Sequence, residues 1–277
     1  MIPIIPPLLR SVVRTASRLA LTGALSIAAM PTLADPREDF LAGLTNDCRG
    51  CDLTDVNLKR RDLAGADFTD AILVRANLHR ANLERAVLVG ADLSFANLNK
   101  TILRRADLSG AILIDTMLYE SDLAAATMAG AVMNGAMLGN SRLMQANMSG
   151  VQLSGADLRE ARMVGVNLEN AVIQGTWFDN VNLSRANLRN ALMNPVSMAG
   201  AMLRGVDARG ANFEQSDLIH ADLSNANLEG ASLRATRLLQ VNLTGANLTG
   251  VSFAGAIMPD GTQIPPDPED VPPAAND

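Results

Sequence analysis

The chain has 277 residues and a formal net charge of −6 at pH 7, from 23 basic and 29 acidic side chains. This acidic balance argues against nucleic acid as a partner, because binding to phosphates requires a basic surface. Only two cysteines and two histidines are present, so few residues are available for thiol or metal chemistry.

Residues 1–34 have the features of a secretory signal peptide. The leader carries three arginines and no acidic residue (Arg10, Arg14 and Arg18), and Leu19–Met30 is a short apolar run. This run is too short for a stable membrane span. The alternative to a cleaved signal peptide is an uncleaved anchor. We therefore predict cleavage after Ala34, export to the periplasm or an equivalent lumen, and no membrane span in the mature chain. The mature chain would carry a formal charge of −9, because the leader holds three basic and no acidic residues.

Residues 35–50 are predicted to cap the start of the repeat that follows. Asp35–Thr45 is typical of a short helix, since Pro36 and early acidic residues suit a helix start. The only cysteines, Cys48 and Cys51, allow three interpretations: a structural disulfide in the cap, a pair of buried thiols, or a redox motif. Export favours the disulfide, and no βαβ context accompanies the motif.

Residues 51–260 form 42 consecutive pentads in one frame. Each pentad reads small residue, Asp or Asn, Leu, and two variable residues, as in Val56-Asn-Leu-Lys-Arg60. The third position is Leu 29 times, Met seven times, Phe four times, and Ile and Ala once each. The first position is Ala 25 times, and only Cys51 and Arg61 depart from Ala, Val, Thr and Ser.

A period of five excludes both a regular helix and a plain strand. A helix repeats its apolar face about every 3.6 residues, and a strand about every two. A solenoid fits if each pentad forms one side of a squared coil and a turn follows at the fourth and fifth positions. The first and third residues then point inward and the second points outward. Arg61 breaks the inner rule, so we expect its pentad near an imperfect end of the stack.

This pattern resembles the pentapeptide-repeat family, whose fold is a right-handed quadrilateral β-helix. The resemblance covers about three quarters of the chain. It implies an all-β solenoid with four pentads per coil, and therefore about 10 coils in a rod roughly 50 Å long. Residues 261–277 follow it with five prolines, four acidic residues and no basic residue, which predicts a flexible tail.

No constellation of catalytic residues is evident in the sequence. It has no phosphate-binding Gly-Lys-Ser/Thr loop, no nucleophile elbow and no His-Glu-x-x-His motif. His79 and His220 would lie about seven coils apart, so they could not share a metal ion. We therefore predict a protein that is not an enzyme and has no cofactor or metal.

The outward positions remain as candidates for function. If residues 20 apart stack, second-position residues form columns, and one column would carry a polar ladder through Asn147, Asn167 and Asn187. Two other, adjacent columns and their neighbours are apolar, and we predict that they form an interaction patch for a protein partner or for self-association. The patch comprises Ile72, Ile112, Ile114, Val132, Val172, Leu192, Met117, Tyr119, Met137 and Trp177. The alternative is that β-branched residues simply suit strands.

A second candidate surface is basic and lies at two neighbouring corners of the early coils. It comprises Arg60, Arg80, Arg85, Lys100, Arg104 and Arg105. One interpretation is a solvated surface, and the other is docking to an anionic envelope surface such as lipid headgroups.

Three functional hypotheses follow from the sequence. The leading one is a non-enzymatic, exported scaffold that presents a rigid surface for protein–protein interaction. A second comes from the family resemblance, which implies that some members mimic DNA and inhibit gyrase, although export fits this poorly. The third is an accessory protein that binds an anionic envelope surface.

Overall fold

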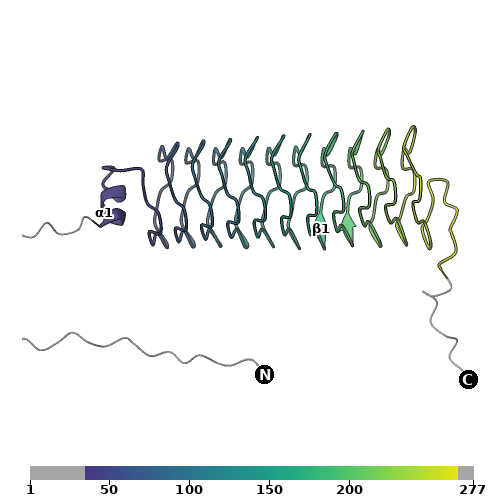
Figure 1. Cartoon of the computed structure of the whole chain (residues 1–277), viewed down its shortest axis with the longest axis horizontal. Helices are drawn as coiled ribbons and strands as arrows, with labels where there is room; N and C mark the ends of the chain where they lie inside the picture. The colour runs from purple at the N-terminus through teal and green to yellow at the C-terminus, as the bar shows by residue number, and fades with distance from the viewer. Residues whose placement is uncertain (1–34, 268–277) are drawn as a thin grey trace, which may run out of the picture. The chain divides into compact units, whose positions relative to one another are not determined.

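The computed structural model describes residues 35–267, which form a stack of squared coils next to one short helix (Figure 1). The predicted signal peptide, residues 1–34, and residues 268–277 lie outside the described residues. The helix α1 spans Pro36–Leu41, and the only strands within residues 35–267 are β1 (Thr176–Trp177) and β2 (Val196–Ser197), which pair in parallel. Every other coil contact is a single bridge, so the described part of the chain is mostly sheet without long strands.

Adjacent coils are in a constant register of 20 residues. The second residue of each pentad forms a parallel bridge with the residue 20 further on, from Asp47 and Asp67 to Arg237 and Ile257. Backbone hydrogen bonds join the coils on both sides; the amide of Leu58, for example, donates to the Asn77 carbonyl at 2.8 Å. Four pentads therefore make one coil, and the predicted right-handed quadrilateral β-helix is confirmed.

A tight turn separates successive sides of each coil. The amide of Ala66 donates to the Leu63 carbonyl at 3.1 Å, and the same bond recurs in almost every pentad. From residue 50 to residue 255, every fifth residue has a positive φ except Pro195, which follows a cis peptide bond. Positive φ at the third residue of a β-turn is the type II pattern, and glycine adopts it most readily. Proline cannot adopt a positive φ, so the turn at Asn194–Pro195 is of a different kind.

The core is one continuous column of first- and third-position side chains. Nearly all of them are fully buried, from Leu53 in the first coil to Leu238 near the last. Buried hydroxyls at first positions find partners in the backbone: Thr101 Oγ1 donates to the Leu78 carbonyl at 2.8 Å. Ser141 Oγ is the exception among the described residues, because it has no hydrogen-bond partner. The inner position therefore accommodates a small polar residue when a backbone carbonyl of the coil can accept a hydrogen bond from its hydroxyl.

The preference for Asp or Asn at the second position has a local cause. The side-chain oxygen accepts a hydrogen bond from the amide two residues later, as Asp52 does from Thr54 at 3.0 Å. This bond fixes the start of each turn. On one face the expected asparagine ladder is present: Asn167 Nδ2 donates to Asn147 Oδ1 at 3.2 Å, and Asn187 Nδ2 donates to Asn167 Oδ1 at 2.9 Å.

The first coil is closed by α1. Phe40 is fully buried and packs edge-to-face on Phe68, with ring centroids 5.3 Å apart. The helix ends at Leu41, earlier than the predicted Thr45, and Gly43 follows with a φ of 76°. Asp47 already bridges to Asp67, so the coils begin one pentad before the predicted boundary at residue 51.

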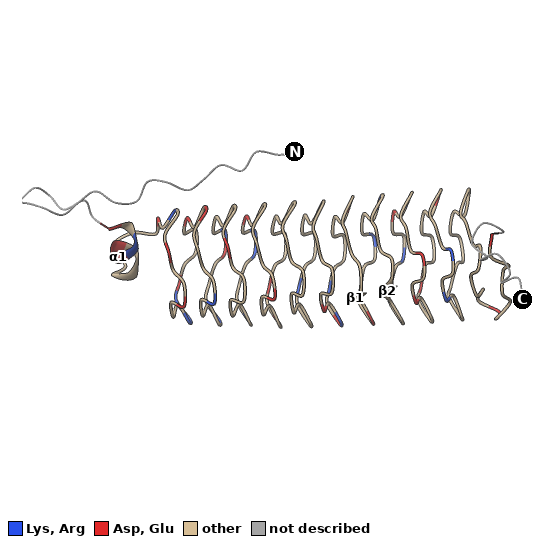
Figure 2. Cartoon of the chain, turned by 90° about the horizontal axis from the view of Figure 1, so that it is seen from below, with Lys and Arg blue, Asp and Glu red and all other residues tan. Residues whose placement is uncertain are grey.

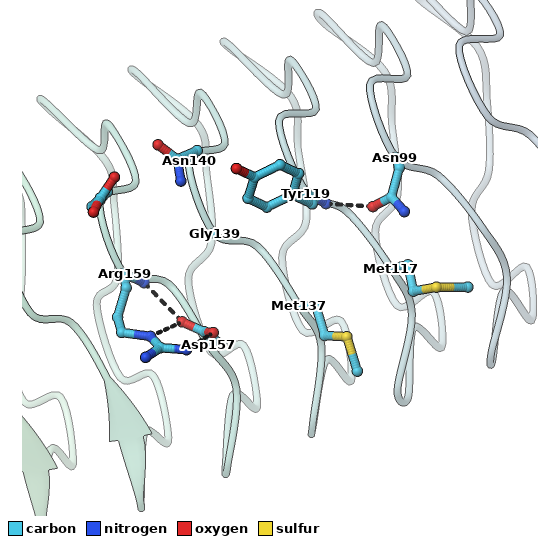
Figure 3. A pocket seen from close by; sticks show the side chains of 9 residues that line it. Asn99, Met117, Tyr119, Met137, Gly139, Asn140, Asp157 and Arg159 are labelled. Carbon is cyan, nitrogen blue, oxygen red and sulfur yellow. Dashed lines mark hydrogen bonds and ion pairs between the residues drawn. The ribbon is translucent and has the colours of Figure 1, made fainter.

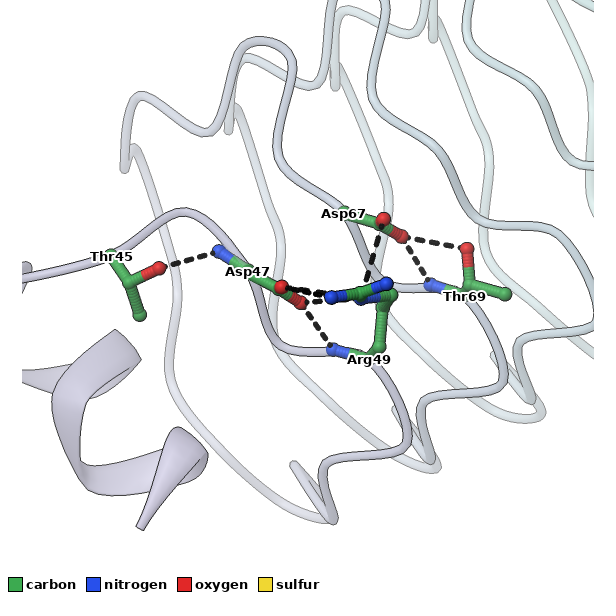
Figure 4. A network of polar contacts seen from close by, with 5 residues as sticks. All are labelled: Thr45, Asp47, Arg49, Asp67 and Thr69. Atoms are coloured by element: carbon green, nitrogen blue, oxygen red, sulfur yellow. Dashed lines mark hydrogen bonds and ion pairs between the residues drawn. The ribbon is translucent and has the colours of Figure 1, made fainter. Parts of the chain in front are cut away.

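A polar network ties this junction together (Figure 4). Thr45 Oγ1 accepts the amide of Asp47 at 3.0 Å, and the Arg49 guanidinium donates twice to the Asp47 carboxylate, at 2.9 and 2.6 Å. Arg49 also approaches Asp67 on the next coil at 3.7 Å. Across this turn Cys48 and Cys51 form a disulfide, with their Cα atoms 5.2 Å apart and both side chains buried. The cross-link therefore encloses only the first turn.

The far end of the stack is covered in part by a returning segment. The amide of Ile264 donates to the Ala256 carbonyl at 2.9 Å, and Gln263 forms an antiparallel bridge with Ile257. Residues 261–267, which we predicted to be part of a flexible tail, therefore pack on the last coil, because they pair with an open backbone edge. Leu248, an inward residue of that coil, stays 37% exposed.

Candidate functional site

The predicted interaction patch divides into two columns on adjacent faces of the rod. We call the first the Ile112 column, which runs through second-position residues at intervals of 20 from Asp52 to Ser252. It contains Ile72, Ile112, Val132, Val172 and Leu192, but Asp92 and Gln152 interrupt it. Ile72 and Leu192 are exposed, the other three apolar members are half-buried, and Ile114 lies half-buried beside the column. This column is therefore apolar in short stretches rather than along its length.

The second, the Met137 column, runs from Asn57 to Ile257 on the next face. Met117 bridges directly to Met137, and Asp157 separates Met137 from Trp177. Tyr119 projects beside Met117, at the fourth position of the same pentad. Met137, Trp177 and Tyr119 are 51%, 47% and 45% exposed. The largest exposed side chains of the predicted patch therefore gather on this face.

A hollow of about 400 Å³ opens on the Met137 face (Figure 3). The thioethers of Met117 and Met137 and the ring of Tyr119 form its apolar wall, and Gly139 lies at its floor. Tyr119, Gly139 and Arg159 occupy the same position on three successive coils, as the amide-to-carbonyl bonds between those coils show. Because Gly139 has no side chain, a gap remains between Tyr119 and Arg159.

Polar groups line the other side of the hollow. The guanidinium of Arg159 donates to both oxygens of Asp157, at 2.9 and 2.6 Å, and so is held within its own pentad. This hydrogen bond is the main reason why the pKa of Asp157 lies below its ordinary value. The carboxylate of Glu160, also in the lining, forms no hydrogen bond or ion pair among residues 35–267. Asn99 accepts the amide of Tyr119 at 2.8 Å and thereby anchors the tyrosine end.

The predicted patch therefore includes three lining residues of the hollow, Met117, Tyr119 and Met137. Sequence reasoning missed Gly139, Asp157, Arg159 and Glu160. A signal for Gly139 was present, because it is the only glycine at a fourth position in all 42 pentads. Every other glycine in the described residues has a positive φ, so Gly139 is the one that the backbone conformation does not require.

The predicted basic patch lies at two corners of the early coils, and two of its members are paired. Lys100 contacts Glu120 at 3.1 Å, and Arg104 contacts Glu84 at 3.4 Å. The other four, Arg60, Arg80, Arg85 and Arg105, form no ion pair with any residue that the structure describes. Burial lowers the pKa of His79, and the nearby charges of Arg80 and Lys59 lower it further. The positive charge of this corner therefore disfavours protonation of His79.

Two further properties of residues 35–267 bear on function. No group of three or more His, Cys, Asp or Glu side chains there is arranged to hold a metal ion. No helix in this part of the chain is long and apolar enough to cross a membrane.

The chain is similar to known proteins along most of its length. The family model for pentapeptide repeats matches it in eight copies between residues 51 and 258. No curated protein matches it. HetL, a pentapeptide-repeat protein involved in heterocyst differentiation regulation in the cyanobacterium Nostoc sp. strain PCC 7120, is 32% identical, with 82% of this chain and 97% of HetL covered and a TM-score of 0.57.

Two other solved structures are also similar. The pentapeptide-repeat protein alr5209 of Nostoc PCC 7120 is 36% identical over 33% of this chain and 75% of its own, with a TM-score of 0.30. QnrB1, a plasmid-mediated fluoroquinolone resistance protein, is 19% identical over 75% of this chain and 90% of its own, with a TM-score of 0.41.

Proposed function

The chain belongs to the pentapeptide-repeat family, and on that premise we propose that it is a non-enzymatic, exported scaffold that binds a protein partner through its Met137 face. The backbone is nearly the same from coil to coil, apart from the Asn194–Pro195 turn and the strands β1 and β2, so mainly the outward side chains distinguish one face from another. The observation that carries the proposal is that exposed Met137 and Tyr119 line a hollow, with exposed Trp177 bridged to the lining residue Asp157 on the next coil. Exposed aromatic and methionine side chains around a recess are typical of protein interfaces.

A binding role also fits the chemistry of this face better than catalysis. Catalysis requires acid, base or nucleophile groups that converge on one reacting atom. In the hollow, the Asp157 carboxylate is already engaged by Arg159, and neither histidine contributes to the lining. The Met and Tyr side chains offer contact area instead, and Met adapts to the shape of a partner.

Export is supported by the leader sequence and by the cysteines. Residues 1–34 combine arginines, a short apolar run and a small-residue cleavage site. The Cys48–Cys51 disulfide would persist in an oxidising compartment such as the periplasm. Recovery of the uncut chain from the cytoplasm of the native host would overturn this part of the proposal.

The test is photo-crosslinking in cells of the native host. A photoreactive amino acid replaces Met137, or Ile112 on the adjacent face, and the control replaces Thr127, a second-position residue on the opposite side of the coil. We expect a distinct adduct with another protein from Met137 and none from Thr127. A product of twice the chain mass would identify self-association through the same face. Equal yields from the two positions would show that the Met137 face has no partner.

The unpaired arginines favour a second candidate function, docking to an anionic envelope surface. Arg60 and Arg80 lie one above the other at one corner, and Arg85 and Arg105 do so at the next. Anionic vesicles in a sedimentation assay should bind the wild type and should release a variant with these four arginines changed to Gln. Binding that is unchanged in this variant would exclude the basic patch.

The DNA-mimic alternative finds less support in the surface. Acidic and basic residues are interspersed along the coils (Figure 2), and several acidic residues pair with arginine, as Asp55 does with Arg75 at 2.7 Å. A mimic of DNA needs regular rows of unpaired negative charge. Inhibition of gyrase supercoiling by sub-micromolar protein would nevertheless favour this alternative over a scaffold.

A further inference from the structure

We propose that the hollow at Gly139 is a binding site for an arginine side chain of the protein partner. This inference rests on the proposed function, because it assigns the chemistry that the Met137 face would recognise. It starts from Gly139, the one glycine among the described residues whose φ is not in the positive range. The backbone conformation therefore does not require glycine at this position. A side chain built there would meet the Tyr119 ring, with the Cβ 3.4 Å from Cδ2. The absence of a side chain therefore keeps the ring accessible and leaves the recess beside it open.

The walls of the hollow suit the stem of a long side chain. Met117 and Met137 lie on successive coils and line one side with flexible, polarisable thioethers. Tyr119 leans along the rod toward Gly139, so that its ring borders the recess (Figure 3). The methylene groups of an arginine can pack on the methionines while its guanidinium stacks on the ring. Arginine suits this arrangement better than lysine, because a planar guanidinium stacks and an ammonium does not.

The charges of the lining leave one carboxylate for an incoming cation. Asp157 and Arg159 neutralise each other through two hydrogen bonds. Lys100 and Glu120 form an ion pair at the nearby corner, at 3.1 Å. Glu160 is exposed, and its carboxylate forms no hydrogen bond or ion pair within residues 35–267. A guanidinium in the hollow would therefore meet an unpaired carboxylate and form charge-assisted hydrogen bonds with it.

Trp177 provides a direct readout of occupancy. It is the only tryptophan of the chain, it is half exposed, and it bridges to Asp157 on the neighbouring coil. Its fluorescence should therefore report a ligand next to Asp157 without any label. The probe is the peptide acetyl-Ala-Leu-Arg-Leu-Ala-amide, and its matched control contains citrulline in place of arginine, which keeps the shape and removes the charge.

Three variants separate shape from charge. Gly139→Leu fills the hollow, and the fourth position tolerates this residue because Leu239 occupies it elsewhere. Glu160→Gln removes the negative charge with little change in volume. Gly139→Ala adds only ordinary van der Waals contacts with the Tyr119 ring and the Arg159 carbonyl, and leaves most of the recess open. A thermal unfolding midpoint within error of the wild type shows that each variant is folded.

We expect a saturable fluorescence change with the arginine peptide and at least about tenfold weaker binding of the citrulline peptide. Glu160→Gln should remove this discrimination, Gly139→Leu should abolish binding, and Gly139→Ala should retain it. Absence of a saturable change, or equal binding by Gly139→Leu, would overturn the proposal. The crosslinking experiment then separates the two proposals: an adduct from Met137 that persists in Gly139→Leu supports the scaffold and rejects the arginine site. Peptide binding without any adduct in cells rejects the scaffold partner instead.

Discussion

The guanidinium of Arg61 lies over the ring of Phe40, with its central carbon 5.2 Å from the ring centroid. Arg61 occupies an inward position of the first coil, where no earlier coil exists to cover it. The helix α1 supplies the cover, and Arg61 also donates to the Phe40 carbonyl at 3.4 Å. A residue that breaks the inner rule of the repeat therefore helps to attach the cap, together with the Phe40–Phe68 contact.

Loss of this contact should weaken the cap. Arg61→Ala is expected to lower the free energy of unfolding by about 1 kcal/mol, because a partly buried cation–π contact is removed. Phe40→Ala should cost more, about 3 kcal/mol, because a buried ring is lost. Urea unfolding followed by circular dichroism gives both values, and Lys59→Ala, at an exposed position nearby, is the control. A cap that is independent of Arg61 would leave Arg61→Ala and Lys59→Ala equally stable.

Substitution of Ser141 is predicted to raise the free energy of unfolding, whereas the cap substitutions lower it. Its buried hydroxyl has no partner among the described residues, whereas the Ser121 hydroxyl donates to the Leu118 carbonyl at 2.7 Å. Ser141→Ala should raise the free energy of unfolding by about 1 kcal/mol, because an unsatisfied polar group leaves the core. Ser121→Ala is the matched control and should lower it by about the same amount. Chemical denaturation of the two variants would refute this reasoning if both changes have the same sign.

The asparagine ladder should contribute to the stability of the middle coils. Asn167 donates to Asn147, and its oxygen accepts from both Asn187 and the amide of Glu169. Asn167→Ala is therefore expected to cost about 2 kcal/mol. The control is Gln152→Ala, because Gln152 is a second-position residue whose side chain forms no hydrogen bond within residues 35–267. Thermal unfolding should separate the two, and a loss of similar size in both would show that the ladder adds nothing.

The disulfide should have a modest effect on stability, because it closes a very short loop. Chain-entropy reasoning gives at most about 2 kcal/mol for such a loop. Reductant should therefore lower the unfolding midpoint of the wild type slightly. It should not affect the double variant Cys48→Leu, Cys51→Ala, which carries the residues most common at those positions. Alkylation followed by mass spectrometry checks the premise, and cysteines that react before reduction in the exported protein would contradict it.

Acid should destabilise the fold through pairs such as Asp157 and Arg159. Because hydrogen bonds from Arg159 lower the pKa of folded Asp157, the pair stabilises the fold above about pH 4. This contribution is lost as the pH falls through the folded-state pKa. Arg159→Gln should raise the pKa of Asp157 toward its ordinary value and flatten the acid limb of the stability profile. Carboxyl titration by NMR measures the shift, and Arg189→Gln, at an arginine without an ion pair in the described part of the chain, is the control.

Much of the fold followed from the sequence, because each inward position had to be filled. Leu53, Leu58 and their successors recur at intervals of five, and only a squared coil can bury all of them. The repeat also indicated where the regular pattern would fail, at Arg61. The ends were less predictable, since α1 and residues 261–267 are positioned by contacts with coils rather than by their own patterns.

The candidate site was accessible to sequence reasoning only in part. Met117, Tyr119 and Met137 could be assigned to one face, because the register of 20 residues follows from four pentads per coil. The hollow could not be predicted from the sequence, since it depends on side-chain conformation. Tyr119 extends along the rod, and Arg159 turns back to Asp157. Position along the chain determines which residues are neighbours on the rod. Only the stacked coils determine which of those neighbours fill the space between them. The reason is that the conformation of each side chain depends on contacts with its own coil and with the coils on either side.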